Sequence, residues 1–252
     1  MKMLLDADSV AFQVGASVQV PIQWSDGVWS MHADGYEAWK ATISSIDEIR
    51  SAIGWDEVDD DIVIALSDPS RKYFRHDILP SYKGNRSIKL GPMLIGFIKD
   101  KMLEHYTSYI RPSLEGDDIL GILATEPRLI KDSTVIVSID KDLDTIPGLH
   151  FNPNKPEKGI YTISEEDADT NHLIQTLTGD SADGYMGCPG VGPVKAKRLL
   201  DKYLGWGTVV DSYTKAGLSE DDALTQARVA RILRADNYDF STKEIKLWCP
   251  TQ

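Results

Sequence analysis

The sequence has few cysteines and no long apolar run, and both shortages narrow the class of protein. Its two cysteines, Cys188 and Cys249, lack the spacing of zinc ligands and are too few for a disulfide scaffold. We interpret them as free thiols in a reducing cytoplasm. No stretch approaches the roughly 20 apolar residues that span a bilayer, and MKMLLDADSV does not have the pattern of a signal peptide. We therefore expect a cytoplasmic protein without a membrane partner.

Positive charge is also scarce, because 27 Lys and Arg stand against 39 Asp and Glu, which gives a net charge of −12. Taken alone, that total argues against a nucleic-acid partner. The distribution argues the other way: residues 71 to 89 carry six Lys or Arg against one Asp, and a second basic group follows a glycine-rich turn near residue 190. The acids gather at the ends of apolar runs, which is the concentration that a divalent metal site needs.

Three short apolar runs each lead to an acidic residue, and helical patterns separate them. The runs end at Asp6, Asp68 and Asp140. Helical spacing of apolar residues follows at residues 34–53, 92–106 and 116–125, with a hairpin expected at 18–32 and a short strand near 109–111. This alternation predicts an α/β fold with a central, mostly parallel sheet flanked by helices. Ligands are expected at the carboxyl ends of its strands.

The last third of the chain is predicted to be helical, over residues 165–177, 194–203 and 219–234. We see no linker or repeat. We therefore expect two parts: an α/β core at residues 1–164, which includes a basic segment at about 71–106, and a helical part at residues 165–252 that packs on it.

Nine acids belong to segments that this fold would bring together, and they are the candidate metal ligands. They are Asp6, Asp68, Glu115, Asp117, Asp118, Asp140, Asp142, Asp180 and Asp183. Any one of them is more often a loop or cap residue, and the acids of SLEGDDILG also suit the positive end of a helix dipole. The joint pattern favours metal: carboxylates without His or Cys companions suit Mg²⁺ or Mn²⁺ rather than Zn²⁺. Two such ions hydrolyse phosphodiesters.

A rival chemistry fits some of the same residues. LLDADSV resembles the signature of haloacid-dehalogenase-type phosphatases, in which Asp6 would be the nucleophile and Asp8 the acid/base. That hypothesis leaves the acids of EGDD and SIDKD and the basic segment without a role. Replacing Asp8 separates the two hypotheses, because a phosphatase would lose its activity and we expect a nuclease to change little.

The basic segment places cations among aromatic side chains. Its candidate contacts to nucleic acid are Arg71, Lys72, Arg75, Tyr82, Lys83 and Arg86. Such a mixture suits a phosphate backbone and an unstacked base, although a solvated basic surface has the same composition.

The second basic group begins at a glycine turn. GCPGVGPVKAKRLL places Gly190 and Gly192 in a turn that enters a helix with Lys195 and Lys197. Exposed amides at such a turn bind phosphate without regard to sequence. We interpret residues 180–203 as containing the hairpin of a helix-hairpin-helix.

Taken together, these motifs resemble the flap-endonuclease superfamily of structure-selective 5′ nucleases. The resemblance rests on LLDAD, SDPSRKYFR with SYKGNR, LEGDD, SIDKDLDTIPG and TGDSADGYMGCPGVGPVKA, in that order, and extends over about four-fifths of the chain. The C-terminal tail, GLSEDDALTQARVARILRADNYDFSTKEIKLWCP, is similar to that of the 5′-3′ exonucleases of T-odd podophages.

The resemblance implies a role for each matching residue. Asp6, Asp68, Glu115, Asp117 and Asp118 would hold the metals nearer the scissile phosphate, and Asp140, Asp142, Asp180 and Asp183 a second, looser group. Lys83 and Arg86 would form the basic pair at the foot of a helical arch made by the basic segment. The glycine turn would be the family's helix-three-turn-helix, where a potassium ion often binds.

The resemblance also implies the activity: a two-metal 5′-3′ exonuclease or structure-selective 5′ nuclease. Its substrates would be 5′ ends of duplex or flap DNA, and also the RNA of RNA–DNA hybrids. It would act in phage DNA replication or recombination, in the host cytoplasm. A catalytically silent binder of DNA junctions is the second alternative besides the phosphatase.

Overall fold

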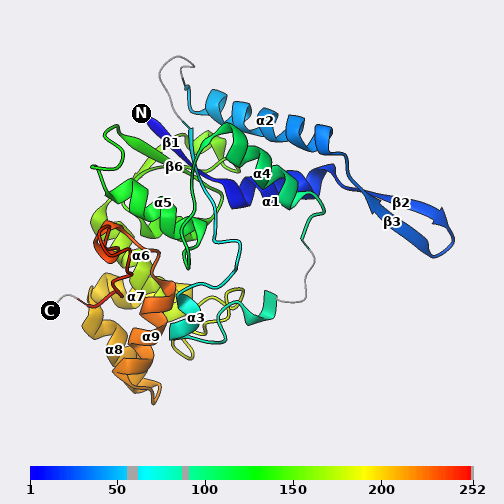
Figure 1. The fold of residues 1–252 in the computed structure, drawn as a ribbon. Coiled ribbons are helices and arrows are strands. Elements are labelled where there is room, and N and C mark those ends of the chain that lie inside the picture. The colour runs from blue at the N-terminus through cyan, green and yellow to red at the C-terminus, as the bar shows by residue number, and fades with distance from the viewer. Residues whose placement is uncertain (56–61, 87–90, 251–252) are drawn as a thin grey trace.

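The fold is built around one six-stranded sheet, seen in a computed structural model that describes residues 1–55, 62–86 and 91–250 (Figure 1). The strand order is β5-β4-β1-β6-β7-β8, and only β8 runs antiparallel to its neighbour. The strands are β1 (Lys2–Asp6), β4 (Ile62–Ala65), β5 (Thr107–Tyr109), β6 (Thr134–Val137), β7 (Gly148–Phe151) and β8 (Tyr161–Ile163). The predicted fold class is confirmed, although β5 begins two residues earlier than expected.

The three central strands fix where the site forms. β1, β4 and β6 are apolar runs buried on both faces, as the strands of a parallel sheet covered by helices should be. In register, Leu5 pairs with Ile64 and Val137, and Asp6 pairs with Ala65. The carboxyl ends of all three strands therefore meet at one edge of the sheet.

Helices cover both faces of the sheet. On one face lie α1 (Ala7–Val18), α2 (Gly35–Ala52) and α4 (Ile95–His105), whose Val10, Ile46 and Ile98 share a core with the strands. The other face is covered by α5 (Gly116–Thr125) and by the C-terminal tail. α1 follows β1 without a loop, because Asp6 caps it by accepting the backbone N–H of Ser9. That helix was not predicted.

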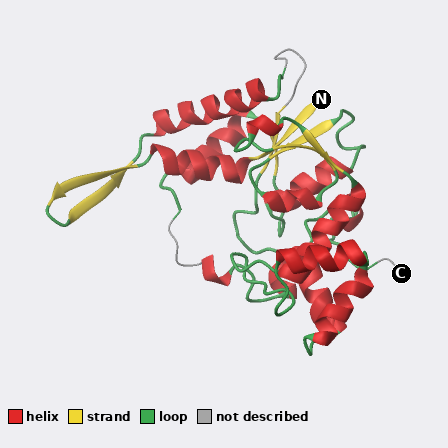
Figure 2. Cartoon of the chain, turned by 180° about the vertical axis from the view of Figure 1, so that it is seen from behind, coloured by secondary structure: helices red, strands yellow, loops and turns green. Residues whose placement is uncertain are grey.

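A two-stranded hairpin projects from the body between α1 and α2 (Figures 1 and 2). Its strands, β2 (Val20–Ser25) and β3 (Val28–His32), meet at the predicted turn, where Gly27 has a φ of 79°. Trp24 and Trp29 are exposed on it. The hairpin carries no predicted site residue.

The C-terminal helices form a layer below the sheet in Figure 1, with a small core of their own. They are α6 (Glu165–Thr178), α7 (Pro193–Lys202), α8 (Trp206–Lys215) and α9 (Glu220–Ala230). Short helices connect other segments: α3 (Arg75–Ile78), η1 (Gly84–Arg86), η2 (Lys141–Thr145), η3 (Pro156–Lys158) and η4 (Ala235–Asn237). α9 packs against α3, and α6 against η2, so this layer joins the α/β core beside the sheet edge. In the described ranges, every helix is too short or too polar to cross a membrane.

Candidate metal centre and nucleic-acid interface

Asp6 ends β1 at the centre of the sheet edge and is almost wholly buried. Its carboxylate accepts hydrogen bonds from the hydroxyls of Ser9 at 2.5 Å and Ser138 at 2.7 Å. Burial raises the pKa of Asp6 above its ordinary value, and these hydrogen bonds oppose that shift. Neither serine was predicted as a site residue, although Ser9 stands at the spacing of a cap partner and Ser138 directly follows β6.

Asp117 lies in the first turn of α5, facing two strand ends. Its pKa is well above the ordinary value, chiefly because of burial and then because Asp6, Asp140 and Glu115 repel its charge. Within the described part of the chain, no group donates a hydrogen bond to its carboxylate. Among the described residues, the Asp117 carboxylate therefore lies near other carboxylates and has no hydrogen-bond donor of its own.

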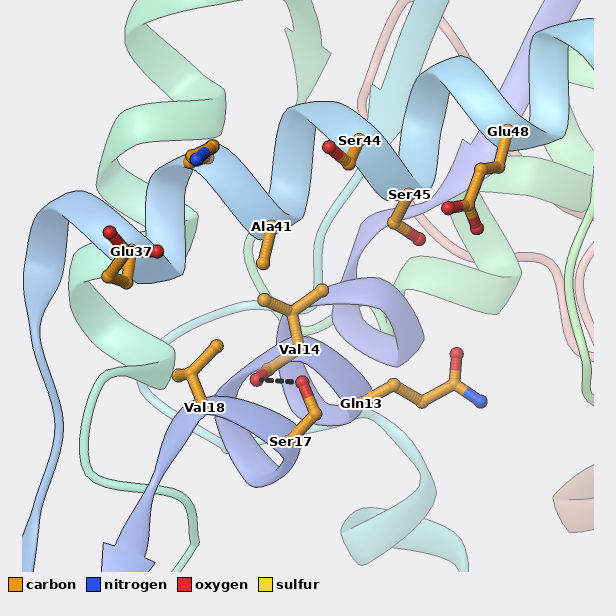
Figure 3. A pocket seen from close by; sticks show the side chains of 10 residues that line it. Gln13, Val14, Ser17, Val18, Glu37, Ala41, Ser44, Ser45 and Glu48 are labelled. Atoms are coloured by element: carbon orange, nitrogen blue, oxygen red, sulfur yellow. Dashed lines mark hydrogen bonds between the residues drawn. The ribbon is translucent and has the colours of Figure 1, made fainter.

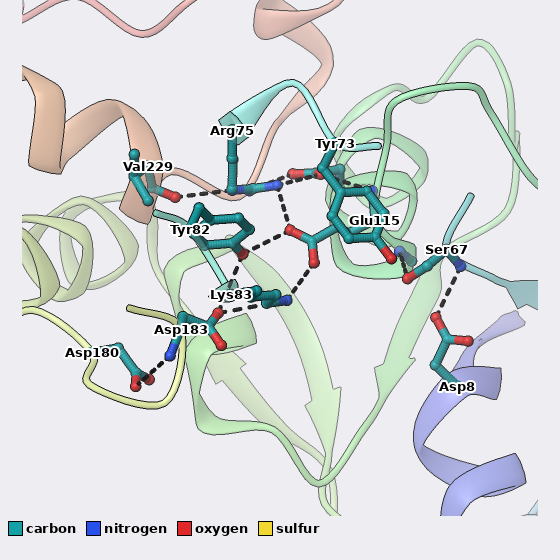
Figure 4. Close-up of polar contacts among 12 residues, drawn as sticks. Asp8, Ser67, Tyr73, Arg75, Tyr82, Lys83, Glu115, Asp180, Asp183 and Val229 are labelled. Carbon is teal, nitrogen blue, oxygen red and sulfur yellow. Dashed lines mark hydrogen bonds and ion pairs between the residues drawn. The ribbon is translucent and has the colours of Figure 1, made fainter. Parts of the chain in front are cut away.

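A second group of acids continues from Asp140. Burial, and then the charge of Asp140, raise the pKa of Asp142 to about 6, and Asp180 and Asp183 add to the repulsion. Asp180 accepts the backbone N–H groups of Ala182 and Asp183, which holds the GDSADG loop in place (Figure 4). Electrostatic repulsion therefore runs from Asp6 through Asp117 and Asp140 to the loop of Asp180 and Asp183.

On the other flank, the carboxylates are matched by cations. The Arg75 guanidinium is buried and forms ion pairs with Asp118 at 2.7 Å and Glu115 at 2.9 Å. It also donates to the carbonyl oxygens of Val229 and Arg231, and so ties α3 to α9 (Figure 4).

The structure places two predicted site residues in this buried ion pair. Asp118 was expected to hold metal, and here its two oxygens accept hydrogen bonds from Arg75 and from the backbone N–H groups of Glu115 and Leu233. Arg75 was expected to contact nucleic acid, but only 3% of it is exposed. Both residues stabilise the fold beneath the site.

Glu115 connects the two flanks. Its carboxylate accepts from Arg75 and from the buried Tyr82 hydroxyl at 2.8 Å, and it contacts the Lys83 ammonium. Burial alone would raise the pKa of Glu115, but the charges of Arg75 and Lys83 outweigh it and lower the pKa. Tyr82, which was predicted to contact nucleic acid, is therefore a buried hydrogen-bond donor to the acids in this structure.

Lys83 lies among the acids at the start of η1. Its ammonium contacts Glu115 and lies 3.6 Å from Asp183 (Figure 4). The side chain of its predicted partner, Arg86, lies outside the described residues.

Asp68 reaches the same edge of the sheet but has structural contacts of its own. Its two oxygens accept the backbone N–H groups of Ser70 at 2.9 Å and Ser113 at 2.8 Å. These bonds lower its pKa and hold the loop after β4 against the segment that leads to α5.

The acids suit a hard cation, although they do not form a closed cage. Among the described residues, no three Asp, Glu, His or Cys side chains are near enough to one another to enclose an ion. The donors are all carboxylate oxygens, and burial, followed by repulsion from neighbouring carboxylates, raises the pKa of Asp117 and Asp142. Oxygen donors of this kind are the ones that hard divalent cations such as Mg²⁺ prefer.

The predicted DNA contacts are partly exposed. Arg71 and Lys72 lie on the surface, as do Gly190, Gly192, Lys195 and Lys197. Gly190 has a φ of 74°, the turn conformation that favours glycine, and Gly192 caps α7, with Pro193 in its first turn. Lys195 donates back to the Gly190 carbonyl at 3.1 Å. The turn therefore presents backbone amides and two lysines to solvent.

The acids lie outside a groove on the described surface. A groove of about 670 Å³ runs between α1 and α2, lined by residues such as Gln13, Ser17, Glu37 and Glu48 (Figure 3). No predicted site residue lines it. The candidate site is instead an edge of the sheet beside α5, α7 and the basic segment.

Comparisons with known proteins match this architecture. Residues 2–147 match the family model described as the 5′-3′ exonuclease, N-terminal resolvase-like domain. The exodeoxyribonuclease of Enterobacteria phage T3 and the exonuclease of Escherichia phage T7 are each 30% identical to this chain. Each match covers 98% of this chain, with 92% of the T3 protein and 93% of the T7 protein.

Solved structures show the same fold at low identity. A complex of bacteriophage T5 D15 flap endonuclease with DNA and metal ions has a TM-score of 0.65 at 13% identity and covers 91% of this chain and 88% of that chain. T5 5′-exonuclease with bound zinc ions has a TM-score of 0.62 at 14% identity, over 91% of this chain and 89% of the other.

Proposed function

The chain belongs to the 5′-3′ exonuclease family, and from that membership we propose a divalent-metal-dependent exonuclease that digests DNA from 5′ ends. The observation that carries the proposal is the run of mutually repelling carboxylates from Asp6 through Asp117 to Asp142 at the sheet edge. Carboxylates that raise one another's pKa lower the free energy of the protein when cations bind between them.

We assign the cations to two groups of acids. Asp6, Asp68, Glu115 and Asp117 would hold the first, and Asp140, Asp142, Asp180 and Asp183 the second. Mg²⁺ is the preferred ion and Mn²⁺ the substitute, because every donor is a hard oxygen. When bound, such ions activate a water and stabilise the leaving oxygen of a phosphodiester. We do not assign Asp118 to either group, because its carboxylate is paired with the Arg75 guanidinium.

Lys83 is the residue that we assign to the scissile phosphate. Its ammonium already lies beside Glu115 and Asp183, so a phosphate bound at those acids would find it within reach. A cation so placed stabilises negative charge as it develops on the phosphoryl oxygens. Arg86 is proposed as its partner from the sequence motif alone.

We propose that residues 165–252 hold the duplex beside the active site. Exposed backbone amides of the Gly190 turn, with Lys195 and Lys197, suit the phosphates of one strand and carry no base-specific donor. The residues of this turn would also hold a potassium ion, which would supply positive charge for a phosphate. Arg71 and Lys72 are exposed on the basic segment and would contact the nucleic-acid strand that enters the arch, residues 71–106.

The substrates we propose are 5′ ends of duplex or flap DNA, and the RNA strand of RNA–DNA hybrids. The T5 neighbour solved with DNA and metal ions is a flap endonuclease, and the phage T3 and T7 relatives are exonucleases. A role in phage replication or recombination in the host cytoplasm follows from those relatives. The phosphatase alternative is weaker, because Asp8, its acid/base, is held by an ion pair and a backbone N–H.

Digestion of end-labelled substrates tests the proposal. Labelled duplex, flap and hybrid substrates are incubated with Mg²⁺ and either the wild type or Asp117→Asn. We expect Mg²⁺-dependent release of 5′ products by the wild type and loss of activity in the variant. DNA binding without cleavage by the wild type would leave only a silent junction binder, and hydrolysis of phosphate monoesters alone would favour a phosphatase.

A further inference from the structure

The Asp8 carboxylate lies just behind the acids, in the first turn of α1. One oxygen, Oδ2, accepts the backbone N–H of Ser67 at 2.9 Å (Figure 4). The other, Oδ1, lies 2.5 Å from the Lys99 ammonium. About a quarter of the Asp8 side chain is exposed, 26% against 31% for Lys99, so solvent screens this pair only in part. The two bonds give Asp8 a fixed place between α1, the end of β4 and α4.

Ser67 passes that restraint on to α5. Its hydroxyl oxygen accepts the backbone N–H of Gly116 at 2.9 Å. The packing there is close, because a Cβ on Gly116 would lie 3.1 Å from Asp8 Oδ2. One carboxylate thus holds together the starts of α1 and α5 and the end of β4.

Each of those three segments carries candidate metal ligands. Asp6 lies two residues before Asp8, and Asp68 directly follows Ser67. Glu115 and Asp117 lie on either side of Gly116. A displacement of any segment by a fraction of an ångström moves ligands relative to one another. Carboxylates that hold ligands in place in this way are about as important to a metal centre as the ligands.

We propose that Asp8 is a positioning residue of the metal centre and that Lys99 couples it to α4, the helix at the end of the arch segment. The inference rests on the proposed function for its effect on cleavage. From the sequence, Asp8 had a role only in the phosphatase hypothesis, and we expected a nuclease to tolerate its loss. From the contacts of Asp8 we now expect the opposite.

The hydrogen bond from Ser67 is the contact that we expect to matter most for positioning, and the ion pair with Lys99 should matter less. Asp8→Asn keeps an oxygen that accepts the Ser67 N–H, whereas Asp8→Ala keeps nothing. Lys99→Met removes only the ion pair. Lys101→Met is the matched control, because Lys101 lies on the same helix and pairs with exposed Glu104.

Three measurements separate positioning from substrate contact. Ca²⁺ titration by calorimetry gives cation affinity, single-turnover cleavage with Mg²⁺ gives the chemical step, and DNA affinity is measured in Ca²⁺. For Asp8→Ala we expect cation affinity or the single-turnover rate to fall about 10- to 100-fold, with unchanged DNA affinity at saturating Ca²⁺. For Asp8→Asn, both quantities should recover to within about threefold of wild type. Lys99→Met keeps the hydrogen bond to Ser67 and loses only the ion pair, so its values should lie between those of wild type and Asp8→Ala. Lys101→Met should equal wild type.

Hydrogen exchange in the metal-free protein provides a readout that does not require activity. Faster exchange of the Ser67 and Gly116 amides is expected in Asp8→Ala, and near wild-type exchange in Asp8→Asn. The proposal fails if Asp8→Ala binds Ca²⁺ and cleaves like wild type, if Asp8→Asn is as impaired as Asp8→Ala, or if the loss appears only in DNA affinity. An inactive wild type would refute the proposed function, while the exchange result would still decide whether Asp8 orders these segments.

Discussion

The acids of this protein divide into two flanks that follow opposite electrostatic rules. On the matched flank, Asp118 and Glu115 are paired with Arg75, and Glu115 also contacts Lys83. On the unmatched flank, Asp117, Asp140 and Asp142 repel one another, and burial raises the pKa of Asp117 and Asp142. Asp117 and Asp118 are adjacent in sequence but point about 100° apart around α5. The matched flank stabilises the fold, and the unmatched flank is available to external cations.

Removing a carboxylate from the matched flank should have the largest effect. Asp118→Ala leaves the buried Arg75 guanidinium without its main partner, and breaking such a pair costs roughly 3–5 kcal/mol. Urea unfolding of the metal-free protein measures the loss. Lys101→Ala is the control, because Lys101 pairs with the exposed Glu104 and should leave the unfolding midpoint unchanged. A stable, metal-binding-deficient Asp118→Ala would instead restore Asp118 as a ligand and abolish the distinction between the flanks.

Removing the neighbouring carboxylate should do the reverse. Asp117→Asn takes away a charge that Asp6, Asp140 and Glu115 repel, so we expect the metal-free protein to unfold at the same temperature as wild type or a higher one. Activity should fall about 100-fold or more, because a carboxylate that would hold the catalytic cation is lost. Thermal unfolding and cleavage of labelled duplex are measured on the same preparation. Loss of stability together with activity would place Asp117 on the matched flank.

Sequence patterns predicted the unmatched flank better than the matched one, for a physical reason. Apolar runs that end in Asp6, Asp68 and Asp140 are local signals, and so is the helix at residues 116–125, which the structure reproduces to the residue. The Arg75–Asp118 pair joins residues 43 positions apart, and no local pattern distinguishes a buried arginine from a surface one. A basic segment with aromatic residues therefore looked like a DNA contact throughout, when Arg75 and Tyr82 in fact lie beneath the acids.

Besides α1 and the short helices, the strands β7 and β8 and the helix α8 were not predicted, because few of their residues are apolar and buried. β7 and β8 are short strands at the far edge of the sheet, and β8 has no fully buried residue. α8 buries only Val209 and Tyr213. Their positions depend on neighbours that are distant in sequence, such as the α6 carbonyl that accepts the Tyr213 hydroxyl at 2.7 Å.

Lys83 lies on the boundary between the two flanks and sharpens the comparison. Lys83→Ala should leave the fold intact, because Arg75 and Tyr82 still bind Glu115. Cleavage should slow by about tenfold or more through lost stabilisation of the phosphate, with cation affinity equal to that of wild type or higher. Lys131→Ala, at an exposed position before β6, is the control for net charge. Normal single-turnover cleavage by Lys83→Ala would refute the phosphate contact.

The smallest expected effect is a change in how stability depends on pH. The pKa of Asp142 is about 6 in the folded protein against an ordinary 3.8, so between these values the folded state binds more protons than the unfolded state. Its charged form therefore destabilises the metal-free protein above pH 6, and this penalty disappears as the pH falls toward 4. Buried His172, whose pKa is lowered to about 3, has the opposite dependence, so the wild-type curve alone does not isolate Asp142.

Comparison with Asp142→Asn isolates it. The variant should be more stable than wild type at pH 7.5, by on the order of 1 kcal/mol because the site is partly screened by solvent, and equal to it near pH 4. With Mg²⁺ at pH 7.5, wild type should become more stable than Asp142→Asn, because the cation stabilises a carboxylate more than the amide that replaces it. If the two proteins have the same unfolding free energy at every pH, Asp142 is not repelled by its neighbours, and the unmatched flank shrinks to the acids around Asp117.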